Sequence, residues 1–297
     1  MIYLTKSYKE NMINQRYSTQ KTGGKRKMDG QLKVAGVQVT VNQNDIFGNM
    51  KNVEKMAMKV AENEKDVDLI LFHEACLESG TPLESFDKEL SDKVHDFWKG
   101  IAAKTGTNIL AGRLERKEDG VHNKATVYTP DGNILADYAK IHLYNSERDT
   151  IVPGSELAMF ELNGMKIGIM ICADFGFPEL SRTYAVKGCH VIAVSSSWAY
   201  PDDDLWVICN QARSSENGVY VVSVDRTGPA SKGVVKVGRS MVCDPDGFIL
   251  SNLWEKTDTY YVQTIYREEV EKRHKTMKWL EWLRPELYTK WMTEKND

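Results

Sequence analysis

The sequence predicts an α/β fold in which layers of helices lie outside β-sheets. Segments with a helical spacing of apolar residues alternate along the chain with short apolar runs, which is typical of mixed helix and strand folds. Asp-Gly or Asn-Gly pairs also separate or precede several of the apolar runs, at 119–120, 131–132, 163–164 and 246–247. Such pairs favour tight hairpin turns, and hairpins join antiparallel strands. The combination predicts mixed sheets rather than purely parallel ones.

Composition narrows the class of protein. The 297 residues could form one large domain or two small ones, and no shift in composition marks a linker. A formal net charge of −3 gives no electrostatic case for binding nucleic acid or an anionic membrane, and no apolar run is long enough to span a bilayer. The 5 cysteines include no C-x-x-C pair, and an odd number argues against a disulfide framework. We therefore expect a cytoplasmic protein, where thiols stay reduced.

Residues 1–30 form a polar extension with a basic cluster between residues 21 and 27. This segment lacks the apolar centre of a secretory signal, and its composition predicts disorder. Met28 is an alternative start of the chain, and a nucleic-acid-binding arm is an alternative reading of the basic cluster. The folded domain is expected over 31–297.

The first part of the domain shows clear periodicity. Apolar residues at helical spacing, such as Val53, Met56 and Val60, support the first helix. The predicted helices are 49–64 and 84–105, and the predicted strands are 33–40, 68–74, 108–114, 122–129 and 133–140.

The run from Met165 to Ile171 is the strongest strand signal, because it is apolar almost throughout and follows an Asn-Gly turn. This strand ends at Cys172, and Pro178 lies where it can open a helix. Cys172 is therefore expected at a strand-to-helix bend, where backbone N–H groups can point at an anion.

The remaining chain continues the alternation. The acidic residues at 202–204 suit the N-terminus of a helix dipole. The predicted helices are 179–187, 205–217 and 267–275, the predicted strands are 189–195, 219–225, 240–243, 247–250 and 260–265, and a Trp-rich tail follows.

Three chemically distinct side chains stand at strand ends. Glu74 ends the run LILFHE, Lys140 ends ILADYAK, and Cys172 ends the central strand. A carboxylate, an ammonium and a thiol could thus meet at one edge. Each also has a structural reading: a solvated carboxylate, a lysine extended along a strand edge, and a small core cysteine.

These segments resemble the nitrilase superfamily of carbon–nitrogen hydrolases, whose catalytic set is Glu, Lys and Cys in that chain order. The resemblance spans roughly residues 32 to 288 and rests on five segments, which are LILFHE, YAKIHL with the following PG, ICADFGFPE, ARSSENGVYVVSVDRTG and VGRSMVCDPDG. It implies a four-layer α-β-β-α sandwich in a single domain, with no cofactor and no metal.

The resemblance also implies the role of each residue. Cys172 would attack the carbon, Glu74 would act as general base, and Lys140 with the backbone N–H of Ala173 would hold the oxyanion. Glu147, in the segment HLYNSERD, matches a second glutamate that orients substrate and supports Lys140. A thiol with a pKa near ~8.5 is mostly neutral at pH 7, so a nearby cation or base is needed.

The expected reaction is hydrolysis of a small carboxamide through a thioester, with release of ammonia. Hydrolysis of a nitrile or of an N-carbamoyl amine are alternatives, and a binding or scaffold protein is the non-enzymatic one. Ala173 stands where a bulkier residue is common in the family, which leaves the substrate open. Trp198 and Tyr200 are expected to line the pocket, with burial in the core as the alternative for Trp198.

Other polar residues are expected to be structural. His73 and His142 flank two site residues and are interpreted as hydrogen-bonding support, since their spacing suggests no metal cluster. Arg213, Glu216 and Asn217 lie at i, i+3 and i+4 of one helix, which favours an ion pair and a cap.

A homodimer, or an assembly of dimers, is implied by the resemblance, with pairing through outer helices. Apolar residues on helix 179–187 (Leu180, Tyr184 and Ala185) and on helix 205–217 are candidate contacts. The tail 277–297 carries three tryptophans, too apolar for a free end. Packing of the tail on its own subunit is the alternative.

Overall fold

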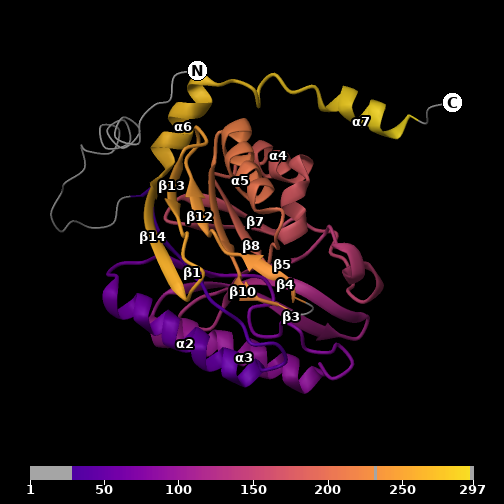
Figure 1. Ribbon diagram of the computed structural model, residues 1–297. Coiled ribbons are helices and arrows are strands. Elements are labelled where there is room, and N and C mark those ends of the chain that lie inside the picture. Colours follow the sequence, from indigo (N-terminus) through magenta and orange to yellow (C-terminus); the bar gives the residue numbers. More distant parts are fainter. Residues whose placement is uncertain (1–28, 231–232, 295–297) are drawn as a thin grey trace.

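Two six-stranded sheets pack face to face in the computed structural model of the protein, which describes residues 29–230 and 233–294 (Figure 1). The first sheet has the order β14 (Thr259–Tyr266), β1 (Gln31–Gln38), β2 (Leu69–Phe72), β3 (Asn108–Lys117), β4 (Gly120–Tyr128), β5 (Ile134–Ala139). The second sheet has the order β13 (Ile249–Asn252), β12 (Met241–Cys243), β9 (Tyr220–Asp225), β8 (Val191–Ser196), β7 (Met165–Ile171), β6 (Met159–Leu162).

Both sheets are mixed, as predicted. In each sheet three central strands run parallel, β1, β2 and β3 in the first and β7, β8 and β9 in the second. The flanking strands are antiparallel. The parallel strands β8 and β9 are buried along their whole length, which explains why they appear in the sequence as continuous apolar runs.

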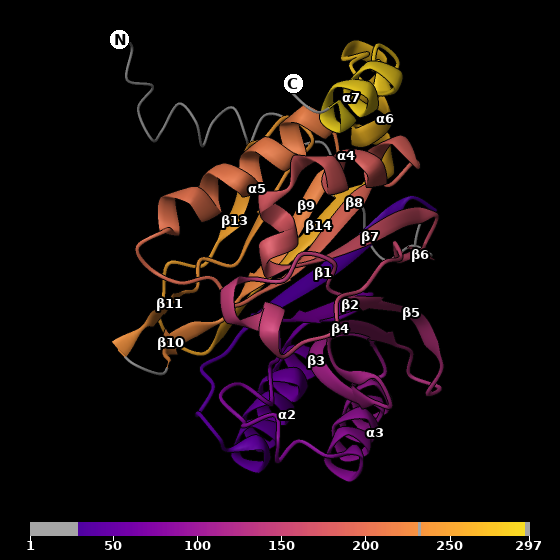
Figure 2. The ribbon, with the colours of Figure 1, turned by 90° about the vertical axis from the view of Figure 1, so that its right-hand side faces the viewer.

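Helices cover the outer face of each sheet and complete a four-layer α-β-β-α sandwich (Figure 2). The first sheet is covered by α2 (Ile46–Asn63) and α3 (Lys88–Thr105), and the second by α4 (Pro178–Val186) and α5 (Asp203–Asn217). Leu71 and Val127 pack with Ile169 and Ala193 in the core between the sheets. The predicted fold class is confirmed.

Most predicted elements are present, with ends displaced by a few residues. The largest displacement is at α3, which was predicted to start at residue 84. It begins at Lys88 because the side chain of Asp87 accepts a hydrogen bond from Leu90 N at 2.8 Å and caps the helix there. The Asn163-Gly164 turn is confirmed, since both residues have positive φ, 49° and 73°, between β6 and β7.

Besides two 3₁₀ turns, four short elements were not predicted: β6, the ribbon of β10 (Thr227–Pro229) and β11 (Val235–Val237), and the helix α7 (Pro285–Thr293). The three strands are only three or four residues long, too short for a periodic signal. α7 follows α6 (Arg267–Thr276) along the chain and buries none of its residues.

The outer helices differ from expectation in one respect. Leu180, Tyr184 and Ala185 of α4 were candidates for a contact between subunits, but all three are buried in the core of their own chain. Gly168 explains this for Tyr184, because a Cβ at that glycine would lie 2.6 Å from the Tyr184 ring. The residues of α4 and α5 that do face outward include Val186, Leu205 and Ile208.

The predicted extension over residues 1–30 lies, apart from Asp29 and Gly30, outside the described residues. Within the described part of the chain, no helix has the length and apolar character needed to cross a membrane.

The two sheets approach closely where β2 ends. Ser195 Oγ of β8 donates a hydrogen bond to the carbonyl oxygen of Phe72 in β2 at 2.9 Å. Gly112 of β3 lies at the same place, and a Cβ there would be 2.3 Å from His73 O and 2.5 Å from Ser195 Oγ. Only a glycine leaves room for this contact, which fixes the separation of the sheets next to Glu74.

Candidate active site

The structure brings four predicted site residues together at one end of the sandwich. Glu74 follows β2 and Lys140 follows β5, whereas Cys172 follows β7 of the second sheet. Lys140 Nζ lies 2.6 Å from Glu74 Oε1 and 2.7 Å from Glu147 Oε2. Glu147 belongs to η1 (Asn145–Asp149), a 3₁₀ turn just after Lys140. Two carboxylates from the loops of the first sheet thus hold one cation.

Lys140 is a buried cation held between two carboxylates. Its side chain is 1% exposed. Burial lowers the pKa of Lys140, but Glu74, Cys172 and Glu147 raise it above its ordinary value, so the ammonium is charged. Burial would raise the pKa of Glu74, yet Lys140 and other hydrogen bonds hold it below its ordinary value. The carboxyl group of Glu74 is therefore ionised.

Asn123 is a site residue that the sequence reasoning missed. It stands on β4, and its Nδ2 donates to Glu74 Oε1 at 2.8 Å and to Glu147 Oε1 at 3.0 Å. Both glutamates are therefore oriented by one amide. A signal was present, because Asn123 is the polar member of an alternating set whose next members, Ala125 and Val127, face the core between the sheets.

Cys172 occupies a strained turn. Its φ is +43°, in the left-handed region that few non-glycine residues adopt, and it begins η2 (Cys172–Gly176). Burial and the neighbouring Glu74 raise the pKa of the Cys172 thiol to about 12, against the lowering effects of Lys140 and the Ser197 backbone N–H. The resting thiol is thus neutral beside an ionised carboxylate.

Asp174 ties the loop after Lys140 to the turn that carries the nucleophile. Its Oδ2 accepts from Ile171 N at 3.0 Å and from Tyr138 OH at 2.7 Å. Its Oδ1 accepts from His142 N and contacts His142 Nδ1, both at 2.8 Å. The ring of His142 also stacks on Phe177 with a centroid separation of 3.7 Å. The supporting role predicted for His142 is confirmed.

His73 also supports the site. Its Nδ1 lies 3.1 Å from the carbonyl oxygen of Glu74, and burial lowers its pKa to about 4, so the ring is neutral and donates. Among the described residues, no three His, Cys, Asp or Glu side chains are grouped as metal ligands would be. Further away, the pair of Arg213 and Glu216 is confirmed at 3.2 Å, and Asn217 Nδ2 donates to Arg213 O at 2.8 Å.

Ala173 and Trp198 lie close to the nucleophile along the chain and across the sheet. Ala173 follows Cys172 within η2, and Trp198 follows β8, the strand beside β7. Trp198 is half-buried, its backbone N donates to Asp225 Oδ1 at 2.6 Å, and its indole N donates to Asp202 O at 3.0 Å. Their roles toward an oxyanion and a substrate stay predictions.

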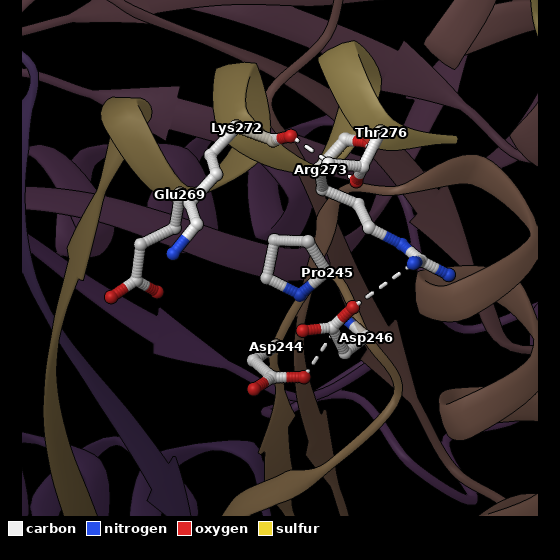
Figure 3. Close-up of a pocket in the computed structure, with 7 residues that line it drawn as sticks. All are labelled: Asp244, Pro245, Asp246, Glu269, Lys272, Arg273 and Thr276. Atoms are coloured by element: carbon white, nitrogen blue, oxygen red, sulfur yellow. Dashed lines mark hydrogen bonds and ion pairs between the residues drawn. The ribbon is translucent and has the colours of Figure 1, made fainter. Parts of the chain in front are cut away.

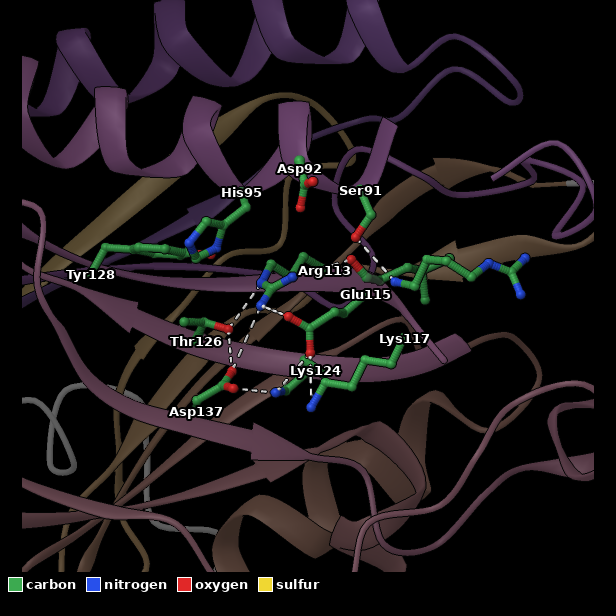
Figure 4. A network of polar contacts seen from close by, with 12 residues as sticks. Ser91, Asp92, His95, Arg113, Glu115, Lys117, Lys124, Thr126, Tyr128 and Asp137 are labelled. Atoms are coloured by element: carbon green, nitrogen blue, oxygen red, sulfur yellow. Dashed lines mark hydrogen bonds and ion pairs between the residues drawn. The ribbon is translucent and has the colours of Figure 1, made fainter. Parts of the chain in front are cut away.

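A second charged cluster on the first sheet lies on the opposite face from Asn123, beneath α3 (Figure 4). Arg113 donates to Glu115 Oε1 at 2.9 Å, Lys124 lies 3.0 Å from Glu115 Oε2, and Lys124 also pairs with Asp137. A hollow of about 610 Å³ beside it is lined by residues of α3 and β3 such as Arg113 and Glu115. Every charge in this cluster is paired with a neighbour, which is typical of a structural network.

Another pocket, of about 300 Å³, lies between the β12–β13 turn and α6 (Figure 3). Its lining includes Asp244, Asp246 and Arg273, and Arg273 Nη1 pairs with Asp246 Oδ1 at 3.2 Å. None of Glu74, Lys140 or Cys172 lines it. This pocket is separate from the candidate active site.

Comparison with known proteins adds independent information. The carbon-nitrogen hydrolase family model matches residues 33–275. A nitrilase from Pyrococcus abyssi is 32% identical over 228 residues, which are 74% of this chain and 84% of that protein. A 2-oxoglutaramate amidase from Bacillus subtilis is 31% identical over 208 residues, 68% of this chain and 79% of that protein.

A solved structure has the same fold. A variant of the amidase from Nesterenkonia sp. AN1, with the acetamide moiety of fluoroacetamide added covalently to its active-site cysteine, has a TM-score of 0.80 and 23% identity. The match covers 91% of this chain and 100% of that chain.

Proposed function

The chain belongs to the carbon–nitrogen hydrolase family, and from this premise we propose that it is a thiol amidase that cleaves a small carboxamide and releases ammonia. The observation that carries the proposal is the arrangement of Lys140 between Glu74 and Glu147, at 2.6 and 2.7 Å, beside Cys172. An ionised base, a buried cation and a neutral thiol are the groups that acyl transfer needs.

The first half-reaction forms the acyl-enzyme. The Cys172 sulfur bonds to the carbonyl carbon while its proton passes to Glu74. The carbonyl oxygen becomes an oxyanion, which Lys140 and the backbone N–H of Ala173 stabilise; such a donor typically contributes about 2.7–4 kcal/mol. Glu74 then gives the proton to the nitrogen, the C–N bond breaks, and ammonia leaves a thioester on Cys172.

The second half-reaction reverses these roles. Glu74 takes a proton from water, and the hydroxide formed bonds to the thioester carbon. When the C–S bond breaks, the proton returns to the Cys172 sulfur, and a carboxylic acid is released. Glu147 holds Lys140 and Asn123 holds Glu74 in position during both half-reactions. Lys140 and Glu74 therefore do not need to move between the two steps.

Hydrolysis of a nitrile is the second candidate, because the same groups can attack a C≡N carbon and a relative at 32% identity is named a nitrilase. The amidase is preferred because several relatives are named amidases, at 31% and 29% identity. An N-carbamoyl amine would follow the amide route.

Ammonia release from a matched panel of small amides, nitriles and N-carbamoyl amines tests the proposal, with Cys172→Ala as the control. We expect turnover of carboxamides that depends on Cys172, together with an acyl adduct on the intact protein by mass spectrometry. Turnover of nitriles alone, or ammonia release that survives in Cys172→Ala, contradicts it. A reducing compartment such as the cytoplasm suits this chemistry, since all 5 cysteines are free thiols.

A further inference from the structure

The carboxyl ends of three neighbouring parallel strands meet beside the nucleophile. In the register of the second sheet, Ile171 of β7 pairs with Ser195 of β8, and Ser196 of β8 pairs with Asp225 of β9. Cys172 is the residue after Ile171, so Ser196 and Asp225 follow it in a row across the sheet. Asp225 has no part in the reaction described above.

Asp225 is an unusual residue for this position because its carboxyl group is 0% exposed. Its Oδ1 accepts the backbone N–H of Trp198 at 2.6 Å, while its Oδ2 has no hydrogen-bond partner among the described residues. Burial raises the pKa of Asp225 well above its ordinary value, and the charged groups that act on it are Lys236 and Glu74. The Trp198 N–H opposes the effect of burial, and Oδ1 is the acceptor that holds this N–H.

The hydrogen bond to Trp198 fixes a short backbone segment next to Cys172. The same segment is held by Lys236 Nζ, which donates to Ser197 O at 2.6 Å, and by Val237 N, which donates to Trp198 O at 3.1 Å. The Ser197 N–H acts on the Cys172 thiol and opposes the effect of burial on its pKa. The orientation of that N–H depends on the peptide units on either side of it.

We propose that Asp225 is a positioning residue for the nucleophile: by accepting the Trp198 N–H, it holds the Ser197 N–H toward the sulfur of Cys172. The effect of Asp225 on turnover rests on the proposed amidase function. Its effect on the reactivity of the Cys172 thiol does not, because the hydrogen bond between Asp225 and Trp198 exists without substrate.

The test measures alkylation of Cys172 by iodoacetamide across pH, by mass spectrometry of the intact full-length protein. In Asp225→Asn the amide oxygen keeps the acceptor for the Trp198 N–H, so we expect a rate within twofold of the parent protein. In Asp225→Val the acceptor is lost at similar volume. We expect alkylation about tenfold slower near neutral pH, since a hydrogen bond to a developing charge is worth about that factor, and a lower kcat with little change in KM.

Ser223→Ala is the matched control. Ser223 is buried on the same strand and donates to Asn210 Oδ1 at 2.6 Å, away from Cys172. Its loss should lower Tm without moving the alkylation profile. Lys236→Met is the second variant, because Lys236 is only half-buried and holds the same segment through Ser197 O. It should slow alkylation of Cys172 about threefold, which is less than Asp225→Val, because it also loosens this segment.

Two results overturn the proposal. One is a folded Asp225→Val protein that is alkylated at the parent rate; if that variant does not fold, an unchanged rate in Lys236→Met has the same meaning. The other is an Asp225→Asn protein as slow as Asp225→Val, which would assign the effect to charge. If no amide is hydrolysed while the alkylation shifts are present, the amidase proposal fails and the role of Asp225 stands.

Discussion

At the residue scale, the charges around Lys140 explain the state of the nucleophile. One ammonium lies between the carboxylates of Glu74 and Glu147, so its positive charge is already balanced. Little of it is left to stabilise a thiolate, and the pKa of Cys172 is accordingly raised to about 12, chiefly by burial and by Glu74. Reactivity must come from Glu74 as a base and from access to the thiol. Cys172 is the half-buried one of the 5 cysteines, and the other four are buried.

Replacement of Cys172 by alanine should abolish ammonia release while the protein unfolds cooperatively at a similar Tm. The reason is that the sulfur forms the covalent bond, whereas its loss removes little packing volume. A discontinuous ammonia assay and a thermal melt check this. The matched control is Cys209→Ala on α5, which should keep full activity; equal losses in the two variants would refute the assignment of Cys172.

Replacement of Lys140 by arginine should lower kcat/KM more than about tenfold, or ~1.4 kcal/mol, although the charge is kept. The Lys140 side chain is 1% exposed and its single nitrogen contacts two carboxylates, so a planar guanidinium does not fit. Steady-state kinetics on the best amide of the panel measure this. Lys93→Arg, on an exposed helical pair, is the control. A Lys140→Arg enzyme above a tenth of parent activity removes the oxyanion role.

At the scale of elements, the η2 turn depends on Asp174 because four contacts converge on its two oxygens. Asp174→Asn keeps one acceptor oxygen and turns the other into a donor that faces Ile171 N and Tyr138 OH. We expect kcat to fall about tenfold and Tm to fall with it, since two buried donors lose their acceptor. Kinetics and thermal melts decide. Tyr138→Phe, which removes one donor only, should show a smaller loss in both; parent-like kcat in Asp174→Asn would contradict this account.

The turn after β2 contains a second buried acid, Glu78, which makes the stability of the fold depend on pH. Glu78 accepts from Leu77 N and Leu114 N at 3.2 and 3.0 Å, and burial raises its pKa from 4.5 to about 7. Between these values the folded protein holds a proton that the unfolded chain has released, so stability falls as pH rises. Glu78→Gln should remove this contribution, leaving a flatter plot of Tm against pH in that range. An unchanged slope would rule out Glu78 as its source.

What the sequence predicts well is what local patterns determine. The strand β7, the Asn163-Gly164 hairpin and the start of α4 at Pro178 follow from neighbouring residues, and each is confirmed. The meeting of Glu74, Lys140 and Cys172 was predicted from their places at strand ends. Resemblance to a family was needed to add Glu147, which lies in a charged surface segment.

What the sequence did not predict depends on contacts between distant elements. Asn123 meets Glu74 across 49 positions of chain, and Asp225 meets Trp198 across 27. Asn123 lies outside the segments that carry the family resemblance, and Asp225 lies inside one of them without a role that the segment indicates. The role of each arises only when strands of one sheet are placed side by side. The left-handed turn at Cys172 is likewise a product of the η2 contacts rather than of its residue type.

At the scale of the whole molecule, the exposed apolar surface supports pairing of two chains. Ile208 on α5 is 60% exposed and Trp282 in the tail is 66% exposed. Val186 on α4 and Leu205 on α5 are also large apolar side chains that are exposed. We propose a homodimer through the α4 and α5 layer, with the tail contributing to the contact. Exposed apolar side chains of this size are typical of interaction surfaces.

Light scattering should therefore give about twice the chain mass of 33.8 kDa. Deletion of 277–297 and the single change Ile208→Glu should each weaken association, because they remove or charge the apolar surface. We expect monomers to lose activity, since α4 follows the η2 turn directly. Lys51→Glu, a change of charge at an exposed position of α2 in the opposite helix layer, is the control. A fully active monomer would disprove the proposal.

The pairing of β14 with β1 has a consequence for synthesis of the protein. All eight residues of β1 pair with β14, which is built from residues 259–266. A ribosome makes the chain from its N-terminus, so Glu74, Lys140, Glu147 and Cys172 have all been made while this side of β1 is still an open edge. A message cut short before codon 259 would encode all four side chains proposed for catalysis and still yield a product with an exposed, aggregation-prone strand. The release of a working enzyme is thus timed by a strand that contributes no residue to the chemistry.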